Sequence, residues 1–99
     1  MLHIVNKSPQ ERSTLDSCLA AAQPGGALLL IEDGVYAATR GNAAQGKLQA
    51  ALAHLEIYVL TPDLEARGMG QALAEGIKQV DYAGFVDLVT KHKNCQSWL

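Results

Sequence analysis

The sequence predicts a three-layer α/β/α sandwich built on a mostly parallel sheet of four to five short strands. The first observation is a run of five apolar residues, Ala27 to Ile31, which is bounded by polar residues and too short for a helix. Such a run is typical of a strand buried on both faces, as in a parallel sheet between helices. The second observation is that predicted strands and helices alternate along the whole chain. Because α/β proteins place ligands and partner loops at the carboxyl ends of such strands, Glu32-Asp33-Gly34 form a candidate functional edge.

Length and composition bound the class of protein. The chain has 99 residues, which predicts a single domain over residues 1–99 with a small core. A net charge of −2 argues against a freestanding nucleic-acid binder, which needs a basic face for phosphates. No apolar run is long enough to span a bilayer, and Met1-Leu2-His3 opens no signal peptide. We therefore expect a cytoplasmic protein with reduced thiols, without membrane contact or direct nucleic-acid binding.

The first half of the chain predicts two strands and three helices. Leu2–Val5 is a short strand, and Ser13 is the expected cap of a helix that ends before Pro24. The apolar positions of that helix have the spacing of one helical stripe: Leu15, Cys18, Leu19 and Ala22. After the strand at 27–31, a short helix is predicted over Gly34–Thr39 with Asp33 as its cap, and a weaker helix over 46–54.

The second half repeats the alternation. Glu56–Leu60 is the third strand, and Thr61-Pro62-Asp63 start a helix that ends at Gly68, with Thr61 as cap and proline at the first helical position. Ile77–Val80 is a fourth strand. Asp81 is the expected cap of a helix over Tyr82–Lys91, whose inward stripe is predicted as Tyr82, Phe85, Val86 and Val89. The tail Cys95–Leu99 is predicted as a last short strand.

The two cysteines differ in their surroundings. Cys18 lies in the middle of a helix on its apolar stripe, where burial raises a thiol pKa and leaves the sulfur inert. Cys95 follows Lys91, His92 and Lys93, a basic neighbourhood that can stabilise a thiolate, but it lies close to the chain end. A disulfide between them is not expected in a reducing compartment.

The remaining polar residues define no catalytic or metal-binding motif. Glu32 and Asp33 form a carboxylate pair without a third ligand nearby in sequence, so helix capping explains Asp33 better than metal binding. His3, His54 and His92 share no ligand spacing. We expect neither a metal nor a cofactor, and a chain that is easier to interpret as a subunit than as an independent enzyme.

Several short segments, in order along the whole chain, resemble the DsrH/TusB family. They are Met1-Leu2-His3, Asn6-Lys7-Ser8-Pro9, Asp33-Gly34-Val35 with Ala37-Ala38, Tyr58-Val59-Leu60 with Asp63-Leu64, Ala66-Arg67-Gly68, Asp81-Tyr82 with Phe85-Val86, and Trp98-Leu99. The resemblance implies a subunit of a sulfur-relay complex, a dimer of heterotrimers with DsrE/TusD-like and DsrF/TusC-like partners. Such a complex takes persulfide sulfur from a TusA-like donor and passes it to a TusE/DsrC-like acceptor. The sulfur then serves 2-thiolation of the tRNA wobble uridine or sulfur oxidation.

The resemblance also bears on Cys18. The principal sulfur-carrying cysteine of such complexes lies on the DsrE/TusD-like partner, while some DsrH-like members carry a cysteine in the first helix, where Cys18 falls. Three hypotheses follow. The chain is an accessory subunit with an apolar surface made by Val35, Tyr36, Met69 and Leu73, or it is itself a persulfide carrier through Cys18, or it is an unrelated ligand-binding module that uses Glu32-Asp33-Gly34.

Overall fold

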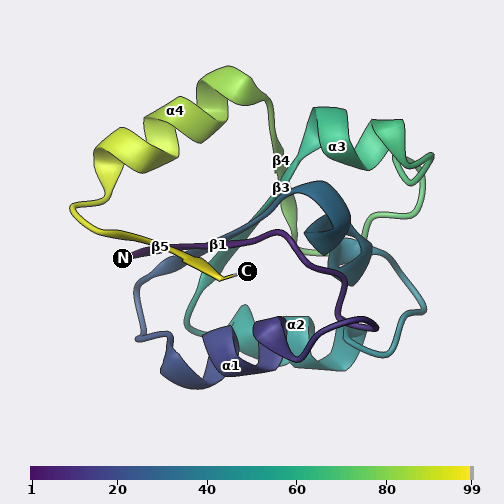
Figure 1. Cartoon of the computed structure of the whole chain (residues 1–99), viewed down its shortest axis with the longest axis horizontal. Coiled ribbons are helices and arrows are strands. Elements are labelled where there is room, and N and C mark those ends of the chain that lie inside the picture. The colour runs from purple at the N-terminus through teal and green to yellow at the C-terminus, as the bar shows by residue number, and fades with distance from the viewer. Residues whose placement is uncertain (99) are drawn as a thin grey trace.

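Five parallel strands form one sheet in the order β4-β3-β2-β1-β5, in a computed structural model that describes residues 1–98 (Figure 1). The elements are β1 (Leu2–Val5), α1 (Thr14–Ala21), β2 (Ala27–Leu30), the 3-10 helix η1 (Glu32–Ala38), α2 (Gln45–Ala51), β3 (Glu56–Leu60), α3 (Thr61–Ala66), β4 (Lys78–Val80), α4 (Tyr82–Lys91) and β5 (Cys95–Trp98). The predicted three-layer α/β class is confirmed, and the sheet is parallel throughout. The predicted last strand is present, while Leu99 lies outside the described residues.

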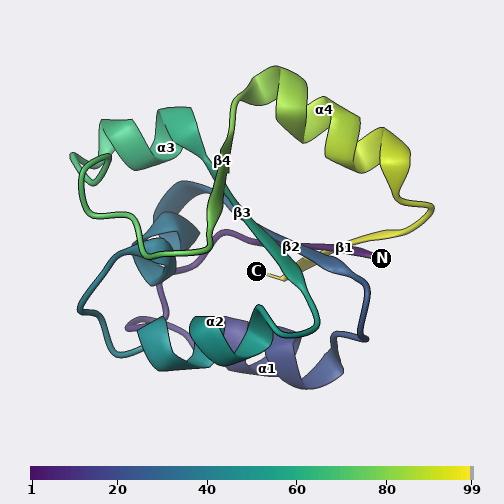
Figure 2. The same ribbon diagram turned by 180° about the vertical axis from the view of Figure 1, so that it is seen from behind.

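The predicted buried strand lies at the centre of the sheet. All four residues of β2 are fully buried, and β2 pairs with β1 on one side and β3 on the other. Side chains alternate along a strand, so Leu28 and Leu30 face one layer of helices and Leu29 faces the other. Figures 1 and 2 show α1 and α2 on one face of the sheet and α3 and α4 on the opposite face. Each fully buried leucine contributes about 1.5–3 kcal/mol, which explains why this segment dominates the core.

The two faces of the sheet are covered unequally. The core on the α1 and α2 side is large and includes Cys18, Leu48 and Ile57. The core on the α4 side has four buried residues, namely Leu2, Ala27, Leu29 and Leu88. Helix α3 also packs against η1 at the carboxyl edge of the sheet. The α4 side of the sheet therefore has the smaller hydrophobic core.

Of the four predicted side-chain caps, the structure contains one. Asp81 Oδ1 accepts a hydrogen bond from the Gly84 backbone N–H at 2.8 Å, as predicted for the start of α4. Ser13 makes no capping bond because its backbone, at φ −84° and ψ 16°, is not in the extended conformation that capping requires. Thr61 is the first residue of α3 and not its cap, and its hydroxyl lies 3.4 Å from the Gln79 side chain instead.

No helix within residues 1–98 is both long and apolar enough to cross a membrane.

Candidate functional site

The carboxyl edge of the sheet holds a network of charged residues that joins η1 to α3. Arg67 Nε donates to Asp33 Oδ1 at 3.0 Å, and Arg67 also donates to the Asp63 backbone carbonyl at 3.1 Å. Asp63 Oδ2 in turn accepts the Glu32 backbone N–H at 2.7 Å. The prediction that Asp33 caps a helix is wrong, because η1 begins at Glu32, so that Asp33 lies within it and pairs across the edge with Arg67.

This network occupies the edge that the sequence nominated for ligands. Glu32 has a positive φ of 48°, a backbone conformation that non-glycine residues rarely adopt, and the bond to Asp63 helps to hold it. Within residues 1–98 no group of three or more His, Cys, Asp and Glu side chains is arranged to hold a metal ion. The Asp33 and Asp63 carboxylates link η1 to α3 through these contacts.

Cys18 lies in the core. Its side chain on α1 is fully buried beside the apolar residues of the α1 and α2 face. Burial raises the pKa of the Cys18 thiol to about 11, so that about one thiol in ten thousand is ionised at pH 7. Because the thiolate is the nucleophile in sulfur transfer, this position disfavours attack on a persulfide.

Cys95 lies at the opposite extreme of exposure. It is the first residue of the edge strand β5, it is exposed, and it pairs in register with Leu2 of β1. Both cysteines are free thiols, so the structure contains no disulfide between Cys18 and Cys95.

His3 is a buried sheet residue, as predicted, with a partner that the sequence did not reveal. Its Nδ1 accepts a hydrogen bond from the Trp98 indole Nε1–H at 3.1 Å, and the two ring centroids are 6.1 Å apart. The indole nitrogen can only donate, so Nδ1 is unprotonated and neutral His3 carries its proton on Nε2. This contact ties β1 to β5, at opposite ends of the chain.

The His3–Trp98 contact predicts a loss of stability at mildly acidic pH. Burial, and then the N-terminal ammonium, lower the pKa of His3 below its ordinary value of 6.5, so the folded state favours the neutral ring. The unfolded chain then binds more protons than the folded chain, and stability that is complete above pH 6.5 falls as the pH drops through the folded pKa. We expect urea denaturation to give a lower free energy of unfolding at pH 5.5 than at pH 7.5.

The pKa of His92 is also lowered, chiefly by burial, so the His92→Gln variant serves as the control. That variant should retain most of the pH dependence if His3 carries it. A free energy of unfolding that is the same at both pH values would contradict the prediction.

Helix α4 presents an apolar surface to solvent, and this corrects the predicted inward stripe. Tyr82 is 61% exposed, Val86 60% and Val89 39%, whereas Leu88 is buried and Phe85 is half-buried. At 100° per residue, the mean direction of Phe85 and Leu88 lies about 90° around the helix from that of the other three, so the apolar positions cover more than one face. We call Tyr82, Val86 and Val89 the α4 surface. The apolar positions of α4 form a stripe too wide for one packing face, and this feature of the sequence could have indicated an exposed apolar surface.

Of the surface predicted from Val35, Tyr36, Met69 and Leu73, only Val35 is fully buried, while the other three residues are half-buried. Val35 is fully buried in η1, and Met69 and Leu73 pack against the large core. Val35 is buried because η1 fills the carboxyl edge between α2 and α3. Apart from Met1, the exposed large apolar side chains of the described residues lie on α4.

The parallel sheet between layers of helices, with a buried thiol and an exposed apolar helix, defines a small α/β protein. Residues 7–95 match the family described as DsrH like protein. The chain is 39% identical over 98 residues to Protein TusB of Pectobacterium parmentieri, covering 99% of this chain and 100% of that protein. It is 36% identical over 100 residues to Protein TusB of Salmonella dublin, again covering 99% and 100%. The chain belongs to the DsrH/TusB family, as its motifs predicted, and membership implies a subunit of a sulfur-relay complex.

Solved structures share the fold at low sequence identity. The YchN protein of E. coli superposes with a TM-score of 0.78 at 15% identity, covering 97% of each chain. MTH1491 of Methanobacterium thermoautotrophicum, a protein of unknown function, gives 0.76 at 17% identity, covering 97% of this chain and 96% of that one. These matches concern the fold alone.

Proposed function

We propose that this chain is an accessory subunit of a cytoplasmic sulfur-relay complex that binds its partners through the α4 surface. The observation that carries the proposal is the exposure of Tyr82, Val86 and Val89 on a helix whose other face is already packed. Contiguous exposed apolar side chains mark protein contacts, because water leaves them when a partner binds. Family membership supplies the class of partner, TusC- and TusD-type subunits.

The assembly we propose is a dimer of heterotrimers. In it, a TusA-like protein donates persulfide sulfur and a TusE/DsrC-like protein accepts it, with the main sulfur-carrying cysteine on the TusD/DsrE-type subunit. The buried Cys18 supports an accessory role for this chain, because a thiol with a raised pKa is a poor nucleophile. The chain then contributes binding surface rather than a reacting atom.

Val86→Asp should abolish co-assembly. Val86 is 60% exposed in the isolated chain, so the substitution should change the free energy of unfolding by no more than about 0.5 kcal/mol. In an assembled interface the same carboxylate would be buried without a counter-charge, which costs about 3 kcal/mol or more and weakens association at least about 100-fold. Co-expression with the two partner subunits, followed by native mass spectrometry, measures the result.

Ala20→Asp is the matched control. Ala20 is an exposed residue of α1, on the same exposed side of that helix as Asp16 and Ser17. Helix α1 lies on the other face of the sheet from α4 (Figure 1). This variant should assemble like the unchanged chain. Normal assembly of Val86→Asp, or equal losses in both variants, would reject the α4 surface as the contact.

The alternative is that the chain is itself a persulfide carrier through Cys18. A Cys18 thiolate would then attack the outer sulfur of a donor persulfide, form a new S–S bond, break the donor's S–S bond and release the donor thiolate. We expect a complex that contains Cys18→Ala to transfer sulfur at the unchanged rate, because the buried thiol takes no part. Loss of transfer in that complex, with assembly intact, would establish the carrier role.

The destination of the sulfur divides the proposal into two branches. The relatives named Protein TusB favour the branch that ends in tRNA 2-thiouridine, whereas a cysteine in the first helix is a feature of some DsrH-like members of the sulfur-oxidation branch. We favour tRNA thiolation, because the matches to TusB proteins extend over 99% of the chain. Loss of 2-thiouridine from the tRNA of a host that lacks this chain would support this branch, and unchanged 2-thiouridine would reject it.

A further inference from the structure

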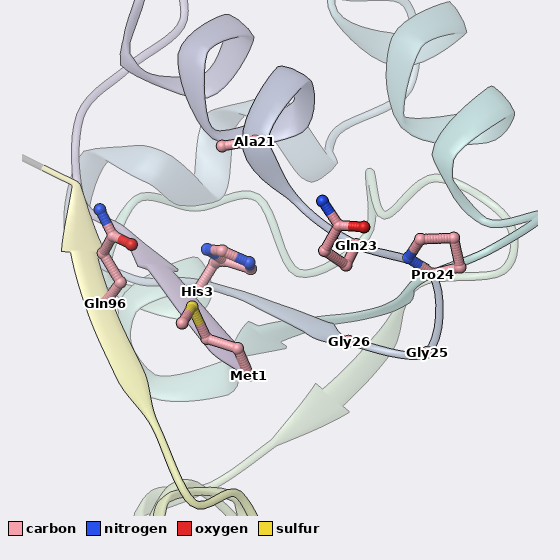
Figure 3. Close-up of a pocket in the computed structure, with 8 residues that line it drawn as sticks. All are labelled: Met1, His3, Ala21, Gln23, Pro24, Gly25, Gly26 and Gln96. Atoms are coloured by element: carbon pink, nitrogen blue, oxygen red, sulfur yellow. The ribbon is translucent and has the colours of Figure 1, made fainter.

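A pocket of about 290 Å³ opens where the amino ends of β1 and β2 meet the end of α1 (Figure 3). His3, Gln23 and Gln96 supply its polar side chains, and the backbone of Pro24–Gly26 forms one wall. The pocket lies on the α1 side of the sheet, opposite the α4 surface. None of the relay steps proposed above uses it.

The wall of the pocket is formed before any ligand binds. The Gly25 backbone N–H donates to the His54 carbonyl at 2.8 Å, and the Gly26 N–H donates to the Gln23 carbonyl at 3.2 Å. A Cβ atom at Gly26 would lie 3.0 Å from the Met1 carbonyl oxygen, so the backbone segments are in close contact there. A wall held in this way costs little ordering entropy when a ligand binds.

The most buried polar side chain in the pocket, His3, is a hydrogen-bond donor of known orientation. The His3 side chain is 3% exposed, and Trp98 occupies its Nδ1, which places the proton on Nε2. Nε2 has no hydrogen-bond partner within residues 1–98 and is not sealed from solvent. Figure 3 shows the imidazole standing between Gln96 on one side and Gln23 with Pro24 on the other.

We propose that this pocket binds a small organic carboxylate. The imidazole Nε2–H and the carboxamides of Gln23 and Gln96 offer three N–H donor groups, and the described lining residues include no carboxylate. A carboxylate presents two oxygens with about four acceptor positions, and its charge-assisted hydrogen bonds are about twice as strong as neutral ones. The volume lies at the lower end of the usual range for small-molecule sites, about 300 Å³ and upward, so the acid is small.

Succinate is the probe, and the fluorescence of Trp98 is the readout. Trp98 is the single tryptophan of the chain, and its ring contacts His3. We expect a saturable change in emission with sodium succinate at pH 7.5 and none with sodium chloride of equal ionic strength. Succinamide, which is uncharged, should bind at least about tenfold more weakly.

Two exposed residues provide variants that should fold normally. Gln23→Ala and Gln96→Ala should each raise the dissociation constant of succinate about tenfold, whereas Gln71→Ala, an exposed glutamine outside the pocket, should leave it unchanged. Equal affinity in all three variants, a response that chloride reproduces, or equal binding of succinamide would each overturn the proposal. None of these outcomes bears on the sulfur-relay assignment, which the co-assembly experiment tests separately.

Discussion

We expect Gly34→Ala to lower the free energy of unfolding by about 3 kcal/mol, because the added Cβ atom would meet backbone that cannot move away. A Cβ atom at Gly34 would lie 2.3 Å from the Val5 carbonyl oxygen, where η1 crosses the end of β1. That carbonyl also accepts the Ile31 N–H at 3.0 Å, so moving it breaks a hydrogen bond of the sheet edge. Urea denaturation measures the difference.

Gly46→Ala is the matched control for this prediction. A Cβ atom there meets nothing within 4 Å, and Gly46 lies in α2, where alanine is the better helix former by about 1 kcal/mol. The control should therefore be neutral or stabilising. If Gly34→Ala were equally well tolerated, β1 and η1 would not approach each other as closely as the structure has them.

Leu88→Ala should detach α4 and lower the free energy of unfolding of the isolated chain by about 2–3 kcal/mol. Leu88 is 6% exposed and is the one α4 side chain in the four-residue core on that face of the sheet. A cavity there removes buried packing that holds the helix, and half-buried Phe85 is the other α4 side chain that packs against this core. Thermal or urea unfolding of the isolated chain measures this loss.

Val89→Ala, one residue further along, distinguishes the role of α4 in the stability of the isolated chain from its role in co-assembly with partner subunits. Val89 is 39% exposed, so truncation should cost the isolated chain no more than about 0.5 kcal/mol, yet it removes part of the α4 surface and should weaken co-assembly. Equal destabilisation of the isolated chain by both variants would mean that Val89 is packed inside the fold. That result would also weaken the α4 surface as the contact with the partner subunits.

The alternation of strands and helices was predictable because it depends on local patterns. The apolar run at Ala27–Leu30 became the central strand, and the proline of Thr61-Pro62-Asp63 marked the start of a helix. Asp81 became a cap because a side chain three residues from its partner needs no tertiary contact. The inward stripe of α4 was predicted wrongly from the periodicity, because five apolar positions spread over more than one face do not say which face the sheet will cover.

The candidate site was less predictable because its contacts join distant parts of the chain. Asp33 pairs with Arg67, 34 residues away, so the carboxylate assigned to a cap became a cross-link between η1 and α3. His3 meets Trp98 across 95 residues, and that contact alone sets which imidazole nitrogen faces the pocket. The inert environment of Cys18 was foreseen from its place on an apolar stripe, and burial in the large core raises its pKa as that position suggested.

The sequence by itself determined the fold class, the family and the order of elements, because buried runs, turns and family motifs are all local features of the chain. Only the tertiary structure decided which surfaces stay exposed and which polar groups meet. The exposure of surfaces and the contacts between polar groups both depend on how the helices pack on the sheet, whose apolar area is limited. On the α4 side that area is small, so Tyr82, Val86 and Val89 remain exposed to solvent.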